Sequence, residues 1–201
     1  MNENAMDELF PPGVIGFPVT PFNQDHSLDL PGFAKNLEVI LSEPFTTFVA
    51  AGGTGELYSL SRDEYLAVIR SAVEGAAGSM PVIAGVGYGV RVAQIMASEA
   101  EKIGASAILA LPPYYANACF DGVLGYLKGI SQATSLPLIL YTRDWLQFSP
   151  EEAERLADEI PSLRGWKDGQ GSLGALQRIR ARLGDRFTWI GGVGDDHVSG
   201  Y

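Results

Sequence analysis

The sequence is poor in the residues that bind metals or form cross-links. Its 201 residues include one cysteine, Cys119, and two histidines, His26 and His197. A single thiol cannot form an intramolecular disulfide, and these three side chains do not make a zinc ligand set of the usual spacing. We therefore expect no structural metal, a small buried Cys119, and histidines with surface or structural roles.

Positive charge and long apolar runs are also scarce. Fourteen Lys and Arg stand against 24 Asp and Glu, which gives a formal net charge of -10. This balance disfavours nucleic acid and anionic membranes as partners. No apolar stretch reaches the roughly 18 residues that a membrane span needs. Residues 1–10 lack the basic and apolar regions of a secretory signal, so a cytoplasmic location is expected.

Glycine, in contrast, is abundant, and 24 of 201 residues is nearly twice the ordinary share of roughly 7%. Short apolar runs recur between the glycine-rich turns. They predict strands at residues 14–19, 45–51, 81–86, 107–111, 137–141, 163–167 and 187–190.

Segments with helical spacing separate the predicted strands. One apolar helix face is formed by Tyr65, Val68, Ile69, Ala72 and Val73. Two helix starts carry the pattern of a capping box: Ser61 with Glu64, and Ser149 with Glu152.

Alternating strands and helices predict an α/β fold with parallel strands. The predicted strands begin 24 to 36 residues apart, a spacing typical of a TIM (β/α)8 barrel. Such barrels take about 250 residues. We therefore expect residues 1–201 to form a single barrel domain truncated after strand 7, without strand 8 and the helices that follow. A doubly wound open sheet of seven strands is the rival fold.

Three segments at predicted strand ends carry polar groups suited to chemistry. The glycine-rich segment AAGGTGE, residues 50–56, could cradle a carboxylate or phosphate, or could be a plain turn before a helix. Tyr115 follows the fourth strand and could relay protons or pack. Tyr141 ends the fifth strand, and Arg143 beside it could clamp a carboxylate or pair with Asp144.

Lys167 is the sharpest single feature of the sequence. It lies at the end of an apolar strand, in the segment GWKDG, where a lysine is costly unless it is paired or deprotonated. Burial would lower its pKa and make the amine nucleophilic toward carbonyl groups. Lys167 is thus either a Schiff-base lysine or a solvated lysine at a strand end.

The order of five motifs resembles one known enzyme family. GGTGE, PPYY, YTRD and GGVGDD follow the second, fourth, fifth and seventh predicted strands, and GWKDGQG lies on the sixth. Together they resemble the dihydrodipicolinate synthase and N-acetylneuraminate lyase family of Schiff-base aldolases. Within that family, GGTGE, YxRD and KDG are most similar to the branch that dehydrates and decarboxylates 5-dehydro-4-deoxy-D-glucarate.

The resemblance implies roles for individual residues. Lys167 would form the iminium with a 2-oxo acid, and Tyr141 would transfer protons. Thr54, with the amides of Gly53 and Gly55, would hold the substrate carboxylate and position Tyr141. The synthase has a relay threonine at the position of Gly53, which argues against synthase activity here.

Further positions complete the expected substrate site. Tyr115 matches the synthase's relay tyrosine in position, and Gly192 falls in the motif of the seventh strand. Arg143, on charge and position, is the candidate for a second substrate carboxylate.

The resemblance implies a lyase of glucarate and galactarate catabolism that needs no cofactor beyond its own lysine. The products would be 2,5-dioxopentanoate, CO2 and water. Two alternatives stay open: a class I aldolase of the same family that cleaves a 2-oxo-3-deoxy sugar acid to pyruvate, and a non-catalytic barrel fragment. The expected partner is a small 2-oxo sugar acid, and full-length members are typically homotetramers.

Overall fold

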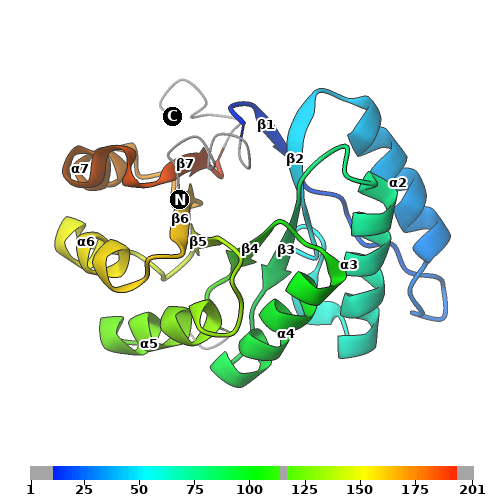
Figure 1. The fold of residues 1–201 in the computed structure, drawn as a ribbon, viewed down its shortest axis with the longest axis horizontal. Helices are drawn as coiled ribbons and strands as arrows, with labels where there is room; N and C mark the ends of the chain where they lie inside the picture. The colour runs from blue at the N-terminus through cyan, green and yellow to red at the C-terminus, as the bar shows by residue number, and fades with distance from the viewer. Residues whose placement is uncertain (1–10, 114–116, 194–201) are drawn as a thin grey trace. The chain divides into compact units, whose positions relative to one another are not determined.

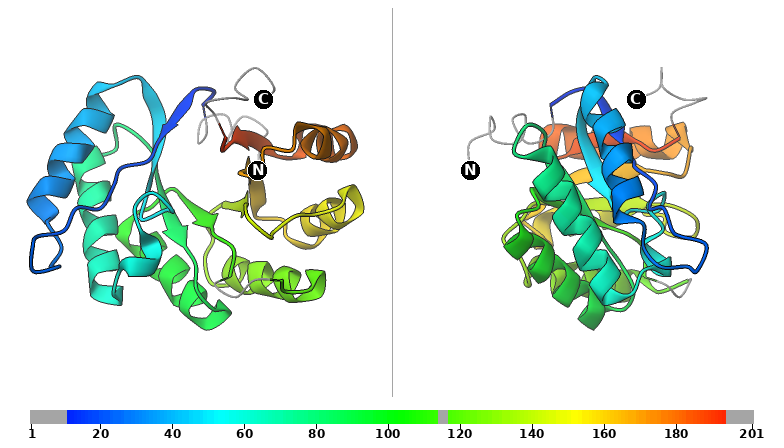
Figure 2. Two further views of the ribbon diagram at one scale, coloured as in Figure 1. Left: turned by 180° about the vertical axis from the view of Figure 1, so that it is seen from behind. Right: turned by 90° about the vertical axis from the view of Figure 1, so that its right-hand side faces the viewer.

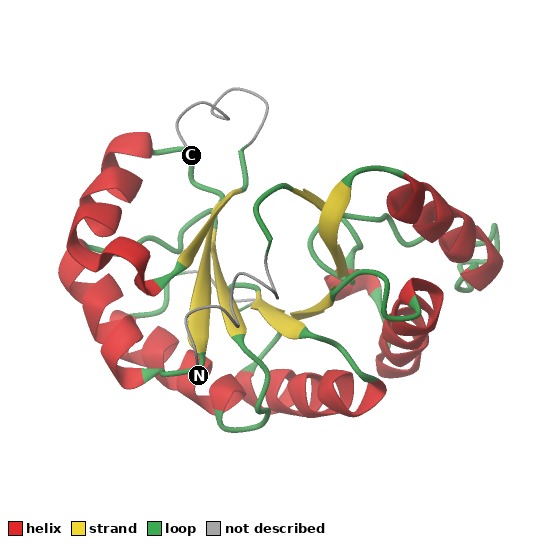
Figure 3. Cartoon of the chain, turned by 45° about the horizontal axis from the view of Figure 1, so that its top comes forward, coloured by secondary structure: helices red, strands yellow, loops and turns green. Residues whose placement is uncertain are grey.

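The computed structural model describes residues 11–113 and 117–193. In this part of the chain strands and helices alternate (Figure 3). The strands are β1 Val14–Gly16, β2 Phe45–Ala50, β3 Val82–Val86, β4 Ala107–Ala110, β5 Leu138–Thr142, β6 Leu163–Asp168 and β7 Thr188–Gly191. The α-helices are α2 Leu30–Ser42, α3 Arg62–Ala76, α4 Val90–Ile103, α5 Phe120–Ser131, α6 Pro150–Glu159 and α7 Leu173–Leu183. Two 3-10 helices are η1 Leu57–Ser59 and η2 Gly184–Arg186.

The strands follow one another in the sheet in chain order, from β1 to β7 (Figure 1). β1 pairs with β2, β2 with β3, β5 with β6 and β6 with β7, all in parallel. A doubly wound sheet would reverse its strand order at a switch point, whereas a (β/α) barrel keeps chain order. The predicted α/β barrel topology is therefore confirmed, and the doubly wound alternative is wrong.

The described residues form two compact units. The first contains residues 11–86 and 95–109, and the second contains 87–94, 110–113 and 117–193. In the first unit α2 and α3 lie side by side, next to β2 (Figure 2). In the second unit α6 packs beside α7.

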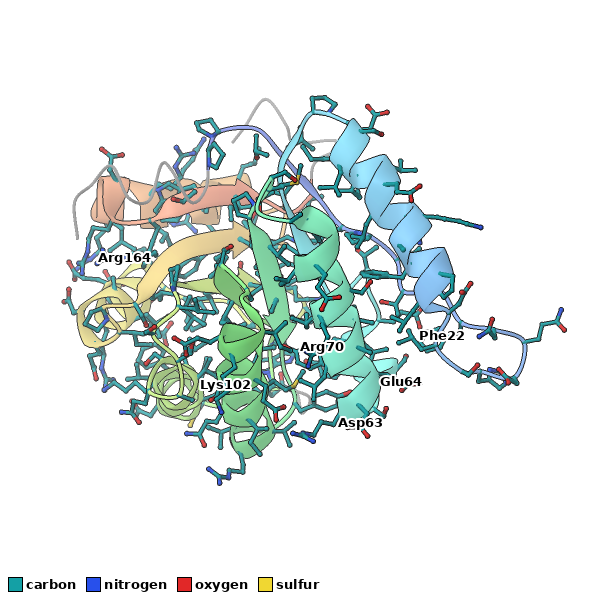
Figure 4. All side chains as sticks on the ribbon, turned by 45° about the vertical axis from the view of Figure 1, so that its right-hand side comes forward. Phe22, Asp63, Glu64, Arg70, Lys102 and Arg164 are labelled. Carbon is teal, nitrogen blue, oxygen red and sulfur yellow. The ribbon has the colours of Figure 1, made fainter. Side chains whose placement is uncertain are left out.

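The first unit buries the predicted apolar face of α3. Tyr65, Val68, Ile69 and Ala72 are fully or almost fully buried, as helical spacing requires, whereas Val73 is only half-buried. The helix begins at a complete capping box, in which Ser61 and Glu64 each accept a hydrogen bond from the other's backbone N–H. Figure 4 labels Asp63 and Glu64 in this first turn, where negative charge is favourable to the helix dipole.

The second unit is anchored by Trp166 of β6. Its side chain is 2% exposed, and its ring centroid lies 5.5 Å from that of Phe148, 5.9 Å from Phe187 and 6.2 Å from Trp189. Successive strand residues point to opposite faces. This aromatic cluster therefore fixes β6 from one face and leaves Lys167 on the other.

The second predicted capping box is also present. Ser149 and Glu152 exchange hydrogen bonds at the start of α6, with Pro150 in the first helical turn. Proline suits this position because its missing N–H would have no helical partner there.

Two local predictions need correction. β1 ends at Gly16 rather than at residue 19, because Pro18 lacks the N–H that would continue the ladder. Cys119 is exposed rather than buried, since it is the N-cap residue before α5 and lies outside the helix's buried face. His26 lies at the surface as expected, whereas His197 lies outside the described residues.

None of the helices that the structure describes has the length and hydrophobicity of a membrane-spanning segment.

Gly85 allows β3 to approach the end of β2. A Cβ at this position would overlap the carbonyl oxygen of Ala51 and would lie 2.7 Å from its carbonyl carbon. We expect Gly85→Ala to lower the free energy of unfolding by about 2–3 kcal/mol, measured by urea denaturation. Gly89→Ala is the matched control, because nothing lies within 4 Å of a Cβ there. Equal midpoints for the two variants would contradict this close approach.

Candidate active site

The register of β5 and β6 brings Tyr141 and Lys167 together. Tyr141 pairs with Lys167, and Thr142 with Asp168. Because strand residues alternate between faces, the first pair lies on one face of the sheet and the second pair on the other. The Lys167 Nζ lies 4.2 Å from the centroid of the Tyr141 ring.

Lys167 is buried, with 7% of its surface exposed. Burial, and to a lesser extent the positive charge of Arg143, lowers the pKa of Lys167 from 10.5 to about 8. A substantial fraction of the amine is therefore neutral, and nucleophilic, near physiological pH. The alternative of a solvated lysine at the strand end does not hold.

Tyr141 stays protonated beside this amine. Burial raises the pKa of Tyr141, and the nearby carboxylates of Asp144 and Asp168 act in the same direction, whereas Arg143 opposes them. A protonated phenol next to a partly neutral amine can donate a proton to an oxygen leaving the carbon that the amine attacks.

Arg143 pairs with Asp144, and its role as a clamp for a substrate carboxylate stays a prediction. Its Nε donates a hydrogen bond of 2.7 Å to Asp144 Oδ2, so the ion pair exists. Its Cζ also lies 5.6 Å from the centroid of the Tyr141 ring. A guanidinium carries five N–H donors, so one bond to Asp144 is compatible with a second, bidentate bond to a substrate carboxylate.

Two glycines allow the backbone to pass close to this pair. A Cβ at Gly192 would lie 3.2 Å from Lys167 Cε and 2.5 Å from the carbonyl oxygen of Asp168. A Cβ at Gly169 would lie 2.6 Å from Tyr141 Cε2. The structure thus places Gly192, predicted as a substrate-site residue, directly beside the lysine.

Thr142 and Asp168 support the site from the opposite face, a role that the motifs did not indicate. Thr142 Oγ1 lies 3.2 Å from the carbonyl oxygen of Lys167 and 3.5 Å from Asp168 Oδ1. The backbone N–H of Gly169 donates to the carbonyl of Thr142 at 2.7 Å. Both side chains are almost fully buried. The sequence could have indicated this pair, because Thr142 and Asp168 directly follow Tyr141 and Lys167 and so point to the opposite face of their strands.

The glycine-rich loop belongs to the first unit. Gly53 and Thr54 are exposed and Gly55 is buried, and Thr20 Oγ1 donates to the carbonyl of Gly55 at 2.7 Å. Within residues 11–113 and 117–193, the backbone N–H groups of Gly53, Thr54 and Gly55 donate no hydrogen bond. Such amides can bind an anion, so the carboxylate-binding role stays a prediction.

The remaining candidates divide between the units and the undescribed residues. Lys167, Tyr141, Arg143 and Gly192 lie in the second unit, and the structure brings them together. Tyr115 lies outside the described residues. In the part of the chain that the structure describes, no three His, Cys, Asp or Glu side chains form a group that could hold a metal ion.

The fold and this site define a (β/α)-barrel protein with a buried lysine amine of lowered pKa at the carboxyl end of a strand. The chain belongs to the Dihydrodipicolinate synthetase family, whose sequence model matches residues 11–200.

Curated relatives point to one branch of this family. The chain is 42% identical over 190 residues to a protein of Xanthomonas campestris pv. campestris (strain 8004), covering 94% of this chain and 62% of the relative. It is 38% identical over 193 residues to a protein of Pseudomonas fluorescens (strain Pf0-1), covering 96% and 64%. Both are named "Probable 5-dehydro-4-deoxyglucarate dehydratase". The chain thus spans less than two thirds of the length of these relatives.

Solved structures of the family share the fold. A prophage protein of the dihydrodipicolinic acid synthase family from E. coli K12, in complex with pyruvate, has a TM-score of 0.88 and 25% identity, covering 95% of this chain and 66% of that chain. The chloride-inhibited dihydrodipicolinate synthase from Acinetobacter baumannii, complexed with pyruvate, has a TM-score of 0.84 and 33% identity, covering 90% and 63%.

The lowered pKa of Lys167 predicts a pH dependence of its reactivity. Cyanate reacts as isocyanic acid, HNCO, with neutral amines, so the rate constant at Lys167, calculated per HNCO concentration, should rise with pH and reach half its maximum at about 8. Peptide mass spectrometry measures this rate residue by residue. In guanidinium-unfolded chain the midpoint should move toward the ordinary value of 10.5. The same midpoint in folded and unfolded chain would contradict the burial of the amine.

Proposed function

We propose that this chain carries the Schiff-base site of a lyase that converts 5-dehydro-4-deoxy-D-glucarate to 2,5-dioxopentanoate, CO2 and water. The observation that carries the proposal is the buried Lys167 amine, with a pKa of about 8, 4.2 Å from the centre of the Tyr141 ring. The dehydratase name of the curated relatives supports the choice of substrate.

The reaction begins at the 2-oxo group of the substrate. The neutral amine of Lys167 attacks the carbonyl carbon, and the resulting hydroxyl leaves as water after it receives a proton. Tyr141 is the proton donor, since its raised pKa keeps the phenol protonated. The product of this step is a protonated imine on Lys167.

Dehydration and decarboxylation use this imine twice as an electron sink. The imine acidifies the adjacent CH2, so a base removes a proton there and the β-hydroxyl leaves as water. The new double bond is conjugated with the iminium, which then accepts the electron pair released when the distal carboxylate departs as CO2. Protonation of the resulting dienamine at carbon, tautomerisation of its enol to the aldehyde and hydrolysis of the imine then free the product and restore the lysine, so no organic cofactor or metal takes part in the proposed reaction.

An aldolase that releases pyruvate from a 2-oxo-3-deoxy sugar acid is the second candidate. It would use the same lysine and tyrosine, and two related solved structures contain pyruvate. The products distinguish the two reactions, because only the dehydratase releases CO2.

The proposed activity is tested by product analysis. The chain incubated with 5-dehydro-4-deoxy-D-glucarate should release one CO2 per substrate consumed and no pyruvate. Lys167→Ala should abolish turnover, whereas Lys102→Ala, which removes an exposed lysine of α4, should retain it. Pyruvate release would identify the aldolase instead, and the absence of both products would contradict both candidates.

Arg143 is the proposed partner of the distal carboxylate. Arg143→Met removes a charge-assisted pair and should raise KM for the diacid by about 10- to 100-fold. Arg178→Met, at an exposed position on α7, is the control for loss of one positive charge. Steady-state kinetics measures both variants. Unchanged KM and kcat in Arg143→Met would remove Arg143 from the site.

A further inference from the structure

The carboxamide of Gln170 joins the loop after β6 to the loop after β5. Its Nε2 donates hydrogen bonds to the carbonyl oxygens of Asp144, at 3.1 Å, and Leu146, at 3.0 Å. Its Oε1 accepts a hydrogen bond of 3.2 Å from Gln147 Nε2. One side chain thus contacts three residues of the segment that directly follows Arg143.

Gln170 is itself fixed to the end of β6. Its backbone N–H donates to Asp168 Oδ1 at 3.1 Å, and Asp168 is 4% exposed. The neighbouring Gly169 N–H donates to the carbonyl of Thr142 at 2.7 Å. The backbone that carries this carboxamide is therefore fixed by hydrogen bonds at both Gly169 and Gln170, just after Lys167.

The segment that Gln170 contacts is a short turn. Leu146 N–H donates to the carbonyl of Arg143 at 2.9 Å, which closes the turn, and Asp144 within it has a positive φ of 53°. The Arg143–Asp144 ion pair has side chains 39% and 65% exposed, and exposed pairs contribute little to stability. Two hydrogen bonds from Gln170 to carbonyls of this turn are a stronger constraint than that pair.

We propose that Gln170 is a positioning residue for Arg143. Its carboxamide holds the turn at residues 143–146, so that the Arg143 guanidinium stays beside the Tyr141 ring and meets the distal carboxylate of the substrate. This inference rests on the proposed function, because it assigns the residue that prepares Arg143 for a diacid.

The test compares Gln170→Met, Gln170→Glu and Gln177→Met. Methionine keeps the length of the side chain and removes its donors and acceptor, whereas glutamate keeps the acceptor and replaces the donors. Gln177 is exposed on α7 and serves as the matched control. Hydrogen exchange at the Leu146 amide needs no substrate, and it should become about tenfold faster in both Gln170 variants and unchanged in Gln177→Met.

Kinetics and carbamylation then show whether the turn acts through Arg143. In Gln170→Met, KM for 5-dehydro-4-deoxy-D-glucarate should rise about tenfold while kcat changes less than about threefold. The pH midpoint of Lys167 carbamylation should move upward, because Arg143 lowers the pKa of Lys167 and would no longer be held near it.

Distinct results separate the two proposals. Unchanged Leu146 exchange in Gln170→Met overturns the positioning role, as does faster exchange with an unchanged carbamylation midpoint. If the unsubstituted chain does not turn over the diacid, the proposed function fails. Exchange and carbamylation still decide whether Gln170 positions Arg143 in that case.

Discussion

The parallel pairing of Tyr141 with Lys167 is the contact on which the candidate site depends. It places an amine in a buried position against an aromatic face, 4.2 Å from the ring centroid. Burial disfavours the ammonium form and makes the amine nucleophilic. The ring face also attracts cations, so we expect it to stabilise the protonated imine of the proposed reaction. A shift of one residue between β5 and β6 would turn either side chain to the opposite face and separate the pair.

The rest of the second unit keeps this register. Trp166 is packed among three aromatic rings on the face of β6 opposite Lys167, which opposes any slip of the strand. Thr142 lies within hydrogen-bond reach of both Lys167 and Asp168 on that same side. Gly192 leaves room beside the lysine where a Cβ would press against its Cε. A buried lysine contradicts the apolar pattern of its strand, and such a local conflict is typical of a functional site.

Local signals in the sequence predicted most of the fold. Apolar runs predicted the positions of the strands, and the predicted capping boxes at Ser61 and Ser149 are present, because these signals act over a few residues. Lys167 was predicted as a site residue because a lysine is unusual at the end of an apolar strand. The contacts of Gln170 could not be predicted from local patterns, since its side chain donates a hydrogen bond to a carbonyl oxygen 26 positions earlier in the chain. The exposure of Cys119 depends on where α5 begins. The sequence has no typical N-cap residue there that would have predicted this boundary.

Borohydride reduction in the presence of pyruvate, followed by tryptic peptide mapping, tests the reactive lysine most directly. Reduction would convert an imine to a stable secondary amine, and trypsin does not cut after a lysine modified in this way. We predict that the adduct lies on a peptide of residues 165–178, with the modified Lys167 inside it. An adduct on another lysine, or none on a folded chain at a pH above about 8, would contradict a Schiff-base site at Lys167.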